Sequence, residues 1–193
     1  RTAGGGFHDN VLTGNGTHPI SLPANFAGEL ATSSRFTGNG IDLVQLSNDL
    51  VDEDATWPLH DADYHMDGGF VLSHPDGVTL TIDDGTSFYF TPDSDVLVGS
   101  GDPATLVVDG TTTGVLFTSA EAAPAPGDWV GMFLSEFTDA ADTRIEGLTL
   151  DYGGSNGFGA ITTYRSAPSI MGCTVQNSAS DGIHIYAYSH PTI

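Results

Sequence analysis

Three histidines lie close together in the sequence, at positions 60, 65 and 74, in a stretch that is also rich in aspartate. Imidazole nitrogens and carboxylates together are typical ligands of zinc. His60 and His65 are five residues apart, and in a β-strand such residues point to opposite faces, so a shared metal would require a loop. The pattern favours exposed loop histidines, and we assign no metal ligand to them.

Pairs of aspartates that follow predicted strands suggest a second kind of chemistry. They occur at Asp83 and Asp84, at Asp93 and Asp95, and at Asp139 and Asp142. Calcium prefers such hard oxygen ligands, and it is the one cofactor that the sequence suggests. None of the pairs matches an EF-hand loop or a nonapeptide Gly/Asp repeat. The residues of a metal site therefore stay unknown.

Catalysis on a sugar would need a third set of residues. Asp139, Asp142 and Asp151 could supply the clustered carboxylates of a glycosidase, although the acidic residues are spread evenly along the chain. A polysaccharide lyase would need a basic residue, but the chain has no lysine, and only Arg144 and Arg165 lie in its regular part. The glycine-rich segment 153–159 lacks the lysine and the helix of a phosphate-binding loop. We predict no catalytic and no cofactor-binding residue, and an enzyme is not favoured.

The overall charge narrows the choice of partners. Twenty-five acidic residues and four arginines give a formal net charge of −21, which repels nucleic acids, anionic membranes and polyuronates. No apolar run is long enough to span a membrane, so membrane insertion is not expected. Aspartate stabilises turns, and we attribute most of the acidic excess to solvated turns. Calcium binding or a salty medium would account for the remainder.

Short strands separated by turn residues dominate the chain, and some of them repeat. Residues 144–150 align with 169–175 at an offset of 25, 159–162 precede 182–185 by 22 to 23, and 168–170 recur as 191–193 after 23. A fainter match relates 7–10 to 36–39 at an offset of 29. A period of about 22–28 residues with two or three strands is typical of a solenoid, whose coils bury their apolar faces by stacking.

We therefore predict an all-β chain that forms a right-handed parallel β-helix. It is one domain over residues 1–193, with less regular early coils or a cap in 1–50 and regular coils in 51–193.

The lone Cys173 takes the place of Leu148 one coil later, so we expect a small buried apolar residue. Trp129 is expected to cover a coil rather than to bind sugar. Asn10 and Asn177 follow strands, where such folds stack asparagines. The predicted inward positions are Val78, Leu80, Ile82, Phe88, Phe90, Val96, Val98, Leu106, Val108, Phe117, Ile145, Leu148, Leu150, Ile170, Cys173, Val175, Ile183 and Ile185.

Three blocks in a fixed order resemble bacterial right-handed parallel β-helix repeat proteins of the pectate-lyase-like superfamily. They are LTIDDGT at 80–86, VLFTS at 115–119 and PGDWVGM at 126–132, preceded by the lead-in at 54–58. The resemblance covers about residues 40–193 and implies a secreted or cell-surface protein. Because this fold carries lyases, hydrolases, adhesins and inert stalks, the resemblance implies no single activity.

These observations favour a structural or adhesive β-solenoid at the bacterial cell surface or outside the cell. The chain is expected to be one unit of a longer fibre, stalk or adhesin, because neither end offers a polar cap. Its predicted partners are neighbouring repeats or further copies that associate end to end, together with polysaccharide. The alternative is a carbohydrate-binding or carbohydrate-cleaving domain, which should show a groove of aromatic and carboxylate side chains on one face. A third hypothesis is a calcium-stabilised secreted protein.

Overall fold

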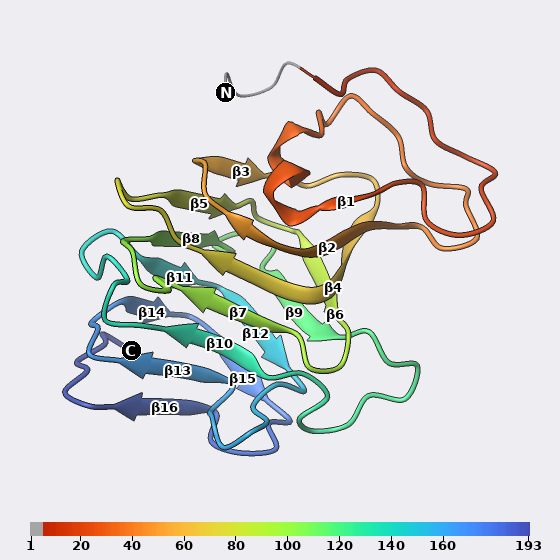
Figure 1. The fold of residues 1–193 in the computed structure, drawn as a ribbon. Helices are drawn as coiled ribbons and strands as arrows, with labels where there is room; N and C mark the ends of the chain where they lie inside the picture. Colours follow the sequence, from red (N-terminus) through yellow and green to blue (C-terminus); the bar gives the residue numbers. More distant parts are fainter. Residues whose placement is uncertain (1–5) are drawn as a thin grey trace.

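The chain winds into a parallel β-solenoid of about seven turns, as predicted (Figure 1). The computed structural model describes residues 6–193. The turns stack from β1 and β2 at one end of the molecule to β14, β15 and β16 at the other, and every strand pair is parallel. Within the described residues, no helix is long and apolar enough to cross a membrane.

One wall of the solenoid is a five-stranded sheet, to which each regular turn contributes its first strand. In chain order the strands are β3 (Ala55–Trp57), β5 (Thr79–Ile82), β8 (Thr105–Asp109), β11 (Arg144–Glu146) and β14 (Ser169–Met171).

The other sheet forms two further walls, and the long strand β4 (Asp63–Leu72) joins them. The first half of β4 pairs with β6 and its second half with β7, so two rows of short strands diverge from one strand. One row contains β6 (Ser87–Phe90), β9 (Val115–Ser119), β12 (Leu148–Asp151) and β15 (Thr174–Gln176). The other contains β7 (Asp95–Val98), β10 (Gly131–Leu134), β13 (Ile161–Tyr164) and β16 (Ile183–Tyr186).

The early part of the chain joins the same sheet. Strand β1 (Ser21–Pro23) pairs with β2 (Leu43–Val51), and β2 pairs with β4. The 3-10 helix η1 (Ala24–Glu29) follows β1 and buries Ala24 and Ala27. A boundary between early and regular coils near residue 50 stays a prediction.

The register confirms the repeats found in the C-terminal third. Ile145 pairs with Ile170, Leu150 with Val175, and Ile161 with Ile183. Ser169 and Thr192 form an isolated parallel bridge, which matches the predicted offset of 23 residues.

The N-terminal repeat was predicted in the wrong register. Phe7 bridges to Leu30 and Val11 to Arg35, so the offset is 23 to 24 residues rather than 29. The rings of Phe7 and Phe36 nevertheless stack, with centroids 6.2 Å apart. Similar side chains can therefore meet between coils without being register partners.

The length of a turn varies more widely than the predicted range of 22–28 residues. Leu43 pairs with Asp63 after only 20 residues, whereas Val108 pairs with Ile145 after 37. The additional residues lie in loops, at 110–114, 120–130 and 135–143. Loops at the corners can lengthen without disturbing the pairing of the strands or the core.

Alternating side chains fill the interior of the solenoid. Strands β5, β6 and β7 all show strict alternation of half-buried and buried residues, as strands with one face on a core should. Fourteen of the predicted inward residues are buried: Val78, Leu80, Ile82, Phe88, Phe90, Val96, Val98, Leu106, Val108, Phe117, Ile145, Leu148, Leu150 and Ile170. Cys173, Val175 and Ile183 are half-buried against this core.

Ile185 is the exception among the predicted core positions, since half of its surface is exposed (50%). It lies in β16, the last strand of its row, which is paired on one side only with β13. A residue that points into a solenoid is covered by the coils on both sides, and Ile185 has such a neighbour on one side.

Candidate functional site

Aromatic side chains gather on the outer face of the row β7, β10, β13 and β16. Along these strands the inward positions are taken by core residues such as Val96, Val98 and Leu134, so the intervening residues point outward. Phe133 on β10 is such a residue, and it is paired with Leu97 on β7. Tyr164 at the end of β13 pairs with Tyr186 at the end of β16.

The rings contact one another from coil to coil. The Phe133 ring stacks on Tyr164 with centroids 6.3 Å apart, and Tyr164 lies 5.6 Å from Tyr186. The loop between β12 and β13 adds Phe158, whose ring meets the edge of Phe133 at 5.7 Å. Tyr186 is 57% exposed and Phe158 44% exposed, so these rings offer free surface to a ligand.

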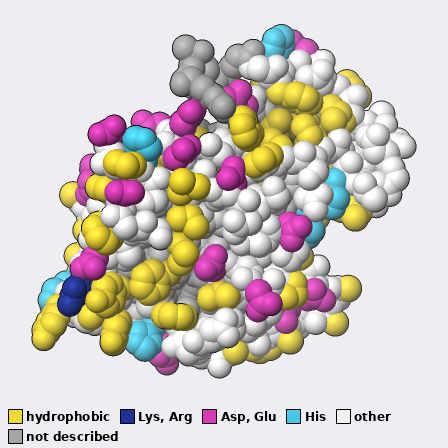
Figure 2. Space-filling view, in the orientation of Figure 1, with side chains coloured by type: hydrophobic (Ala, Val, Ile, Leu, Met, Phe, Trp, Pro, Cys, Tyr) yellow, Lys and Arg dark blue, Asp and Glu magenta, His cyan; other side chains and the backbone are white. Residues whose placement is uncertain are grey.

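A groove of about 600 Å³ runs between these rings and the turns at the ends of β7 and β10. Figure 2 shows hydrophobic side chains gathered over the lower part of this face, with charged side chains at the margin. We call this surface the aromatic groove. It is lined by Leu97, Val98, Gly99, Ser100, Gly101, Phe133, Ser135, Glu136, Phe137, Gly157, Phe158, Thr162, Tyr164, His184 and Tyr186.

The charged residues of the aromatic groove are mostly paired. The guanidinium of Arg165 donates to the Glu136 carboxylate over 3.0 Å and lies 5.2 Å from the centroid of the Tyr164 ring. His184 Nδ1 lies 3.0 Å from the Asp181 carboxylate. These contacts hold polar groups at the rim while the floor of the groove stays aromatic.

Asp95 differs from the other acids near the groove. It lies at the start of β7 and lines a smaller hollow of about 190 Å³, which shares Leu97, Phe133 and Phe158 with the aromatic groove. Within residues 6–193 no cationic side chain forms an ion pair with it. Burial raises the pKa of its carboxyl group, against a smaller opposing effect of a hydrogen bond from its own backbone N–H.

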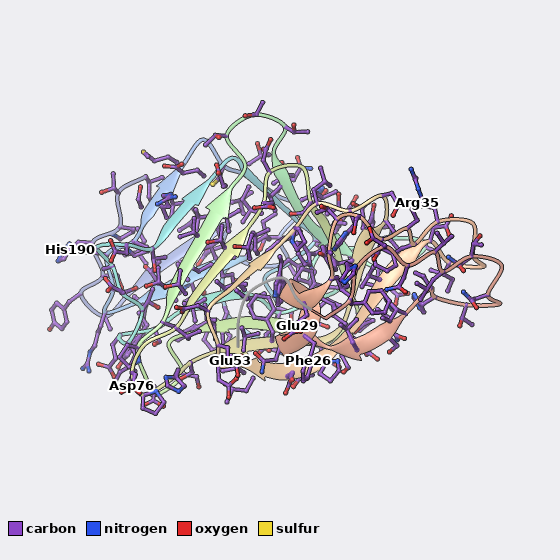
Figure 3. All side chains as sticks on the ribbon, turned by 90° about the horizontal axis from the view of Figure 1, so that it is seen from above. Phe26, Glu29, Arg35, Glu53, Asp76 and His190 are labelled. Atoms are coloured by element: carbon purple, nitrogen blue, oxygen red, sulfur yellow. The ribbon has the colours of Figure 1, made fainter. Side chains whose placement is uncertain are left out.

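A second concave region lies beside η1 and is acidic. It has a volume of about 1040 Å³, and its lining includes Glu29, Asp52, Glu53, Asp54 and Asp76. Figure 3, seen from above, shows Glu29 and Glu53 near η1, with Asp76 farther along the same edge. In the described part of the chain, no three His, Cys, Asp or Glu side chains are arranged to hold a metal ion.

The histidines are placed differently from the exposed loop positions that we predicted. His60 lies in the loop before β4, where its ring meets the edges of Phe36 at 5.1 Å and Tyr64 at 5.9 Å. His65 points outward from β4 and stacks on His18 at 5.1 Å. Burial lowers the pKa of both imidazoles, because it disfavours their charged form. His74 lies apart in the turn after β4, where its Nδ1 accepts from the N–H of Asp76.

Three of the aspartates considered for calcium or for catalysis accept hydrogen bonds from nearby groups, namely Asp84, Asp139 and Asp151. Asp84 accepts hydrogen bonds from the backbone N–H groups of 112–114, and Asp139 accepts one from Ala141. Asp151 ends β12 and accepts from Gln176 and Asn177. Asp139 and Asp142 lie in the loop that follows β10.

Four individual residues were also given roles from the sequence. Trp129 is fully buried, stacks on Phe90 at 4.3 Å and donates to the Asp151 carbonyl, so it covers the core as predicted. Burial raises the pKa of the Cys173 thiol, in keeping with an apolar role. The side-chain amide of Asn177 donates to the Asp151 carboxylate and that of Asn10 to the His8 carbonyl, and an asparagine stack at either position stays a prediction.

Sequence reasoning missed the residues of the aromatic groove. One signal was present, since the repeat that aligns 161 with 183 also aligns Tyr164 with Tyr186. Phe158 carried no such signal, because it lies in the glycine-rich segment that we interpreted only as a turn. Its place over β10 depends on the path of that loop.

Comparisons of the chain with protein-family models, with curated proteins and with solved structures gave no match. The parallel solenoid agrees with the β-helix implied by the sequence blocks, and no family match supports the pectate-lyase-like superfamily itself.

Proposed function

We propose that the protein is an adhesive β-solenoid that binds polysaccharide along the aromatic groove. The observation that carries this proposal is a set of contacting rings on one outer face, the exposed Phe158 and Tyr186 together with the half-buried Phe133 and Tyr164. Sugar rings present flat faces of C–H groups, which pack against the negative face of an aromatic ring. The charged groups at the rim can bond to sugar hydroxyls.

The proposal is for binding rather than cleavage. Hydrolysis of a glycosidic bond uses two carboxyl groups that flank the bond. Glu136 is paired with Arg165 at 3.0 Å, and Asp95 lines the smaller hollow that adjoins the groove. The rings therefore form a platform on which a chain can rest, and the groove does not offer a free pair of acids.

The location that fits this role is the bacterial cell surface or the space outside the cell. Polysaccharides are abundant there, and a rigid solenoid can present a binding face at a distance from the cell. The sequence blocks shared with secreted β-helix proteins support this location.

The Tyr186→Ala variant tests whether polysaccharide binds along the aromatic groove. The ring is exposed and contacts Tyr164 and His184 only at the surface, so its loss should leave the fold intact. We expect affinity for a bound hexasaccharide to fall about tenfold, which corresponds to the loss of one ring contact. Tyr89→Ala, which removes an outward tyrosine from β6 away from the groove, should leave affinity unchanged.

The measurement is calorimetric titration with β-1,4-linked hexamers of glucose, N-acetylglucosamine and glucosamine, and with the α-1,4-linked hexamer of galacturonate. At least one of the first three should bind, and the polyuronate should bind least because of the net charge of −21. If no hexamer binds while an apolar dye does, the groove belongs to an apolar partner and the proposal is wrong. Equal losses for Tyr186→Ala and Tyr89→Ala would also contradict it.

End-to-end association is a second role, favoured by the last turn of the solenoid. There Val175 and Ile183 are half-buried and Ile185 is 50% exposed, so apolar side chains of the core column reach the surface. Strands β15 and β16 also present free edges, which invite pairing with another strand. We propose that a second copy covers this turn.

Light scattering over a range of protein concentrations tests this association. Particle mass should rise with concentration, and Ile185→Asp should keep the chain monomeric because it places a charge in the contact. A chain that stays monomeric at every concentration would contradict the role.

A further inference from the structure

We propose that the saccharide carries free amino groups and that Asp95 binds one of them as an ammonium. This inference rests on the proposed binding of polysaccharide and adds the chemical class of the sugar. The observation behind it is a half-buried carboxylate, next to an aromatic groove, that has no cationic partner among residues 6–193.

The position of Asp95 on β7 leaves its carboxylate accessible to a ligand. Val96 and Val98 point into the core, so Asp95 and Leu97 point outward. The register partners of Asp95 on both sides are glycines, Gly69 on β4 and Gly131 on β10. Neither has a side chain, so no side chain at these register positions covers the carboxylate, and Asp95 lines the hollow of about 190 Å³.

The surroundings of Asp95 favour a cation. Its hollow is lined by the outward apolar residues Leu97 and Phe133 and by Phe158 from the loop before β13. An ionised carboxylate in such a place has lost part of its hydration, and a bound ammonium compensates for this loss through a charge-assisted hydrogen bond. The aromatic faces nearby also attract cations.

Asp95 is the acid best suited to this role in the groove region. Glu136 already has Arg165 as its partner, and Asp181 has His184. The net charge of −21 attracts a cationic chain from solution and repels an anionic one. An amino sugar combines the two features that the groove recognises, since its ring carbons suit the aromatic floor and its ammonium suits Asp95.

The test uses two ligands that differ only in acetylation, the β-1,4-linked hexamers of glucosamine and of N-acetylglucosamine, titrated at mildly acidic pH into the intact chain. We expect the amino hexamer to bind about tenfold more tightly, which is the effect of one hydrogen bond to a charged group. Asp95→Asn should remove this preference, so that the variant binds the two hexamers with equal affinity. Asp93→Asn makes the same change of charge two residues away, in the exposed turn before β7, and should have no effect.

The outcomes separate this inference from the function on which it rests. If both hexamers bind equally and Asp95→Asn changes neither affinity, the amino-sugar inference is wrong. The proposed function still stands in that case, provided that Tyr186→Ala weakens the binding of the hexamers. If neither these hexamers nor the glucose hexamer binds, both fail. Retained melting temperatures of Asp95→Asn and Asp93→Asn show that the variants are folded.

Discussion

Replacement of Phe88 by alanine is expected to lower the free energy of unfolding by about 3–5 kcal/mol. Phe88 is fully buried and pairs with Tyr64 in the preceding turn and Phe117 in the next. Its ring stacks on Tyr64 at 4.8 Å and meets the edge of Phe117 at 5.2 Å. Removal of the ring leaves a void in the middle of three stacked turns, which cannot collapse without disturbing the strand register.

Urea unfolding followed by circular dichroism measures this loss. Tyr89→Ala is the matched control, because Tyr89 is the next residue on β6 and its half-buried side chain points outward. We expect the control to be clearly less destabilising. If the two variants unfold at the same urea concentration, Phe88 does not lie in the core as described.

Gly147→Ala is expected to be the second strongly destabilising change, by roughly 2–5 kcal/mol. Gly147 has φ of +61°, a conformation that costs a residue with a Cβ about 1–2 kcal/mol. A Cβ at this position would also lie only 1.9 Å from the carbonyl oxygen of Gly110. The backbones of two adjacent turns would have to separate to make room, and this adds the cost of overpacking.

The matched control for Gly147 is Gly172, one turn later. Its φ is +62°, but the nearest atom to an added Cβ is 3.9 Å away. Gly172→Ala should therefore show only the conformational cost of about 1–2 kcal/mol. The difference between the two variants in thermal or urea unfolding measures the close approach of the turns at Gly110 and Gly147. No difference would mean that the turns are not packed as closely as described.

The sequence predicted the solenoid because its core is periodic. Each turn must place an apolar residue at the same point of its strands, so Ile145 and Ile170 or Leu150 and Val175 recur at equal offsets. The period does not determine the length or the path of the loops between the strands. The long turn between Val108 and Ile145 and the register of Phe7 depend on loops that carry no repeat.

The candidate site was harder to predict for a related reason. Outward residues are not constrained by the core, so the aromatic side chains of β10, β13 and β16 stand out only when three turns are stacked. Phe158 reaches the same face from a loop, and Asp95 resembles other turn aspartates until its glycine neighbours are known. The half-buried positions of His60 and His65 could not be predicted either, because they depend on contacts with Phe36 and His18 that are distant in sequence.

The most direct test of polysaccharide binding is to map the contact by nuclear magnetic resonance. The backbone amide signals of the intact chain are followed while the best-binding hexasaccharide is added. We predict that the shifts concentrate in residues 95–101, 131–137, 157–164 and 184–186, which form the aromatic groove and the hollow beside it. Shifts confined to the acidic region around 25–32 and 52–56, or no shifts at saturating ligand, would contradict the proposed function.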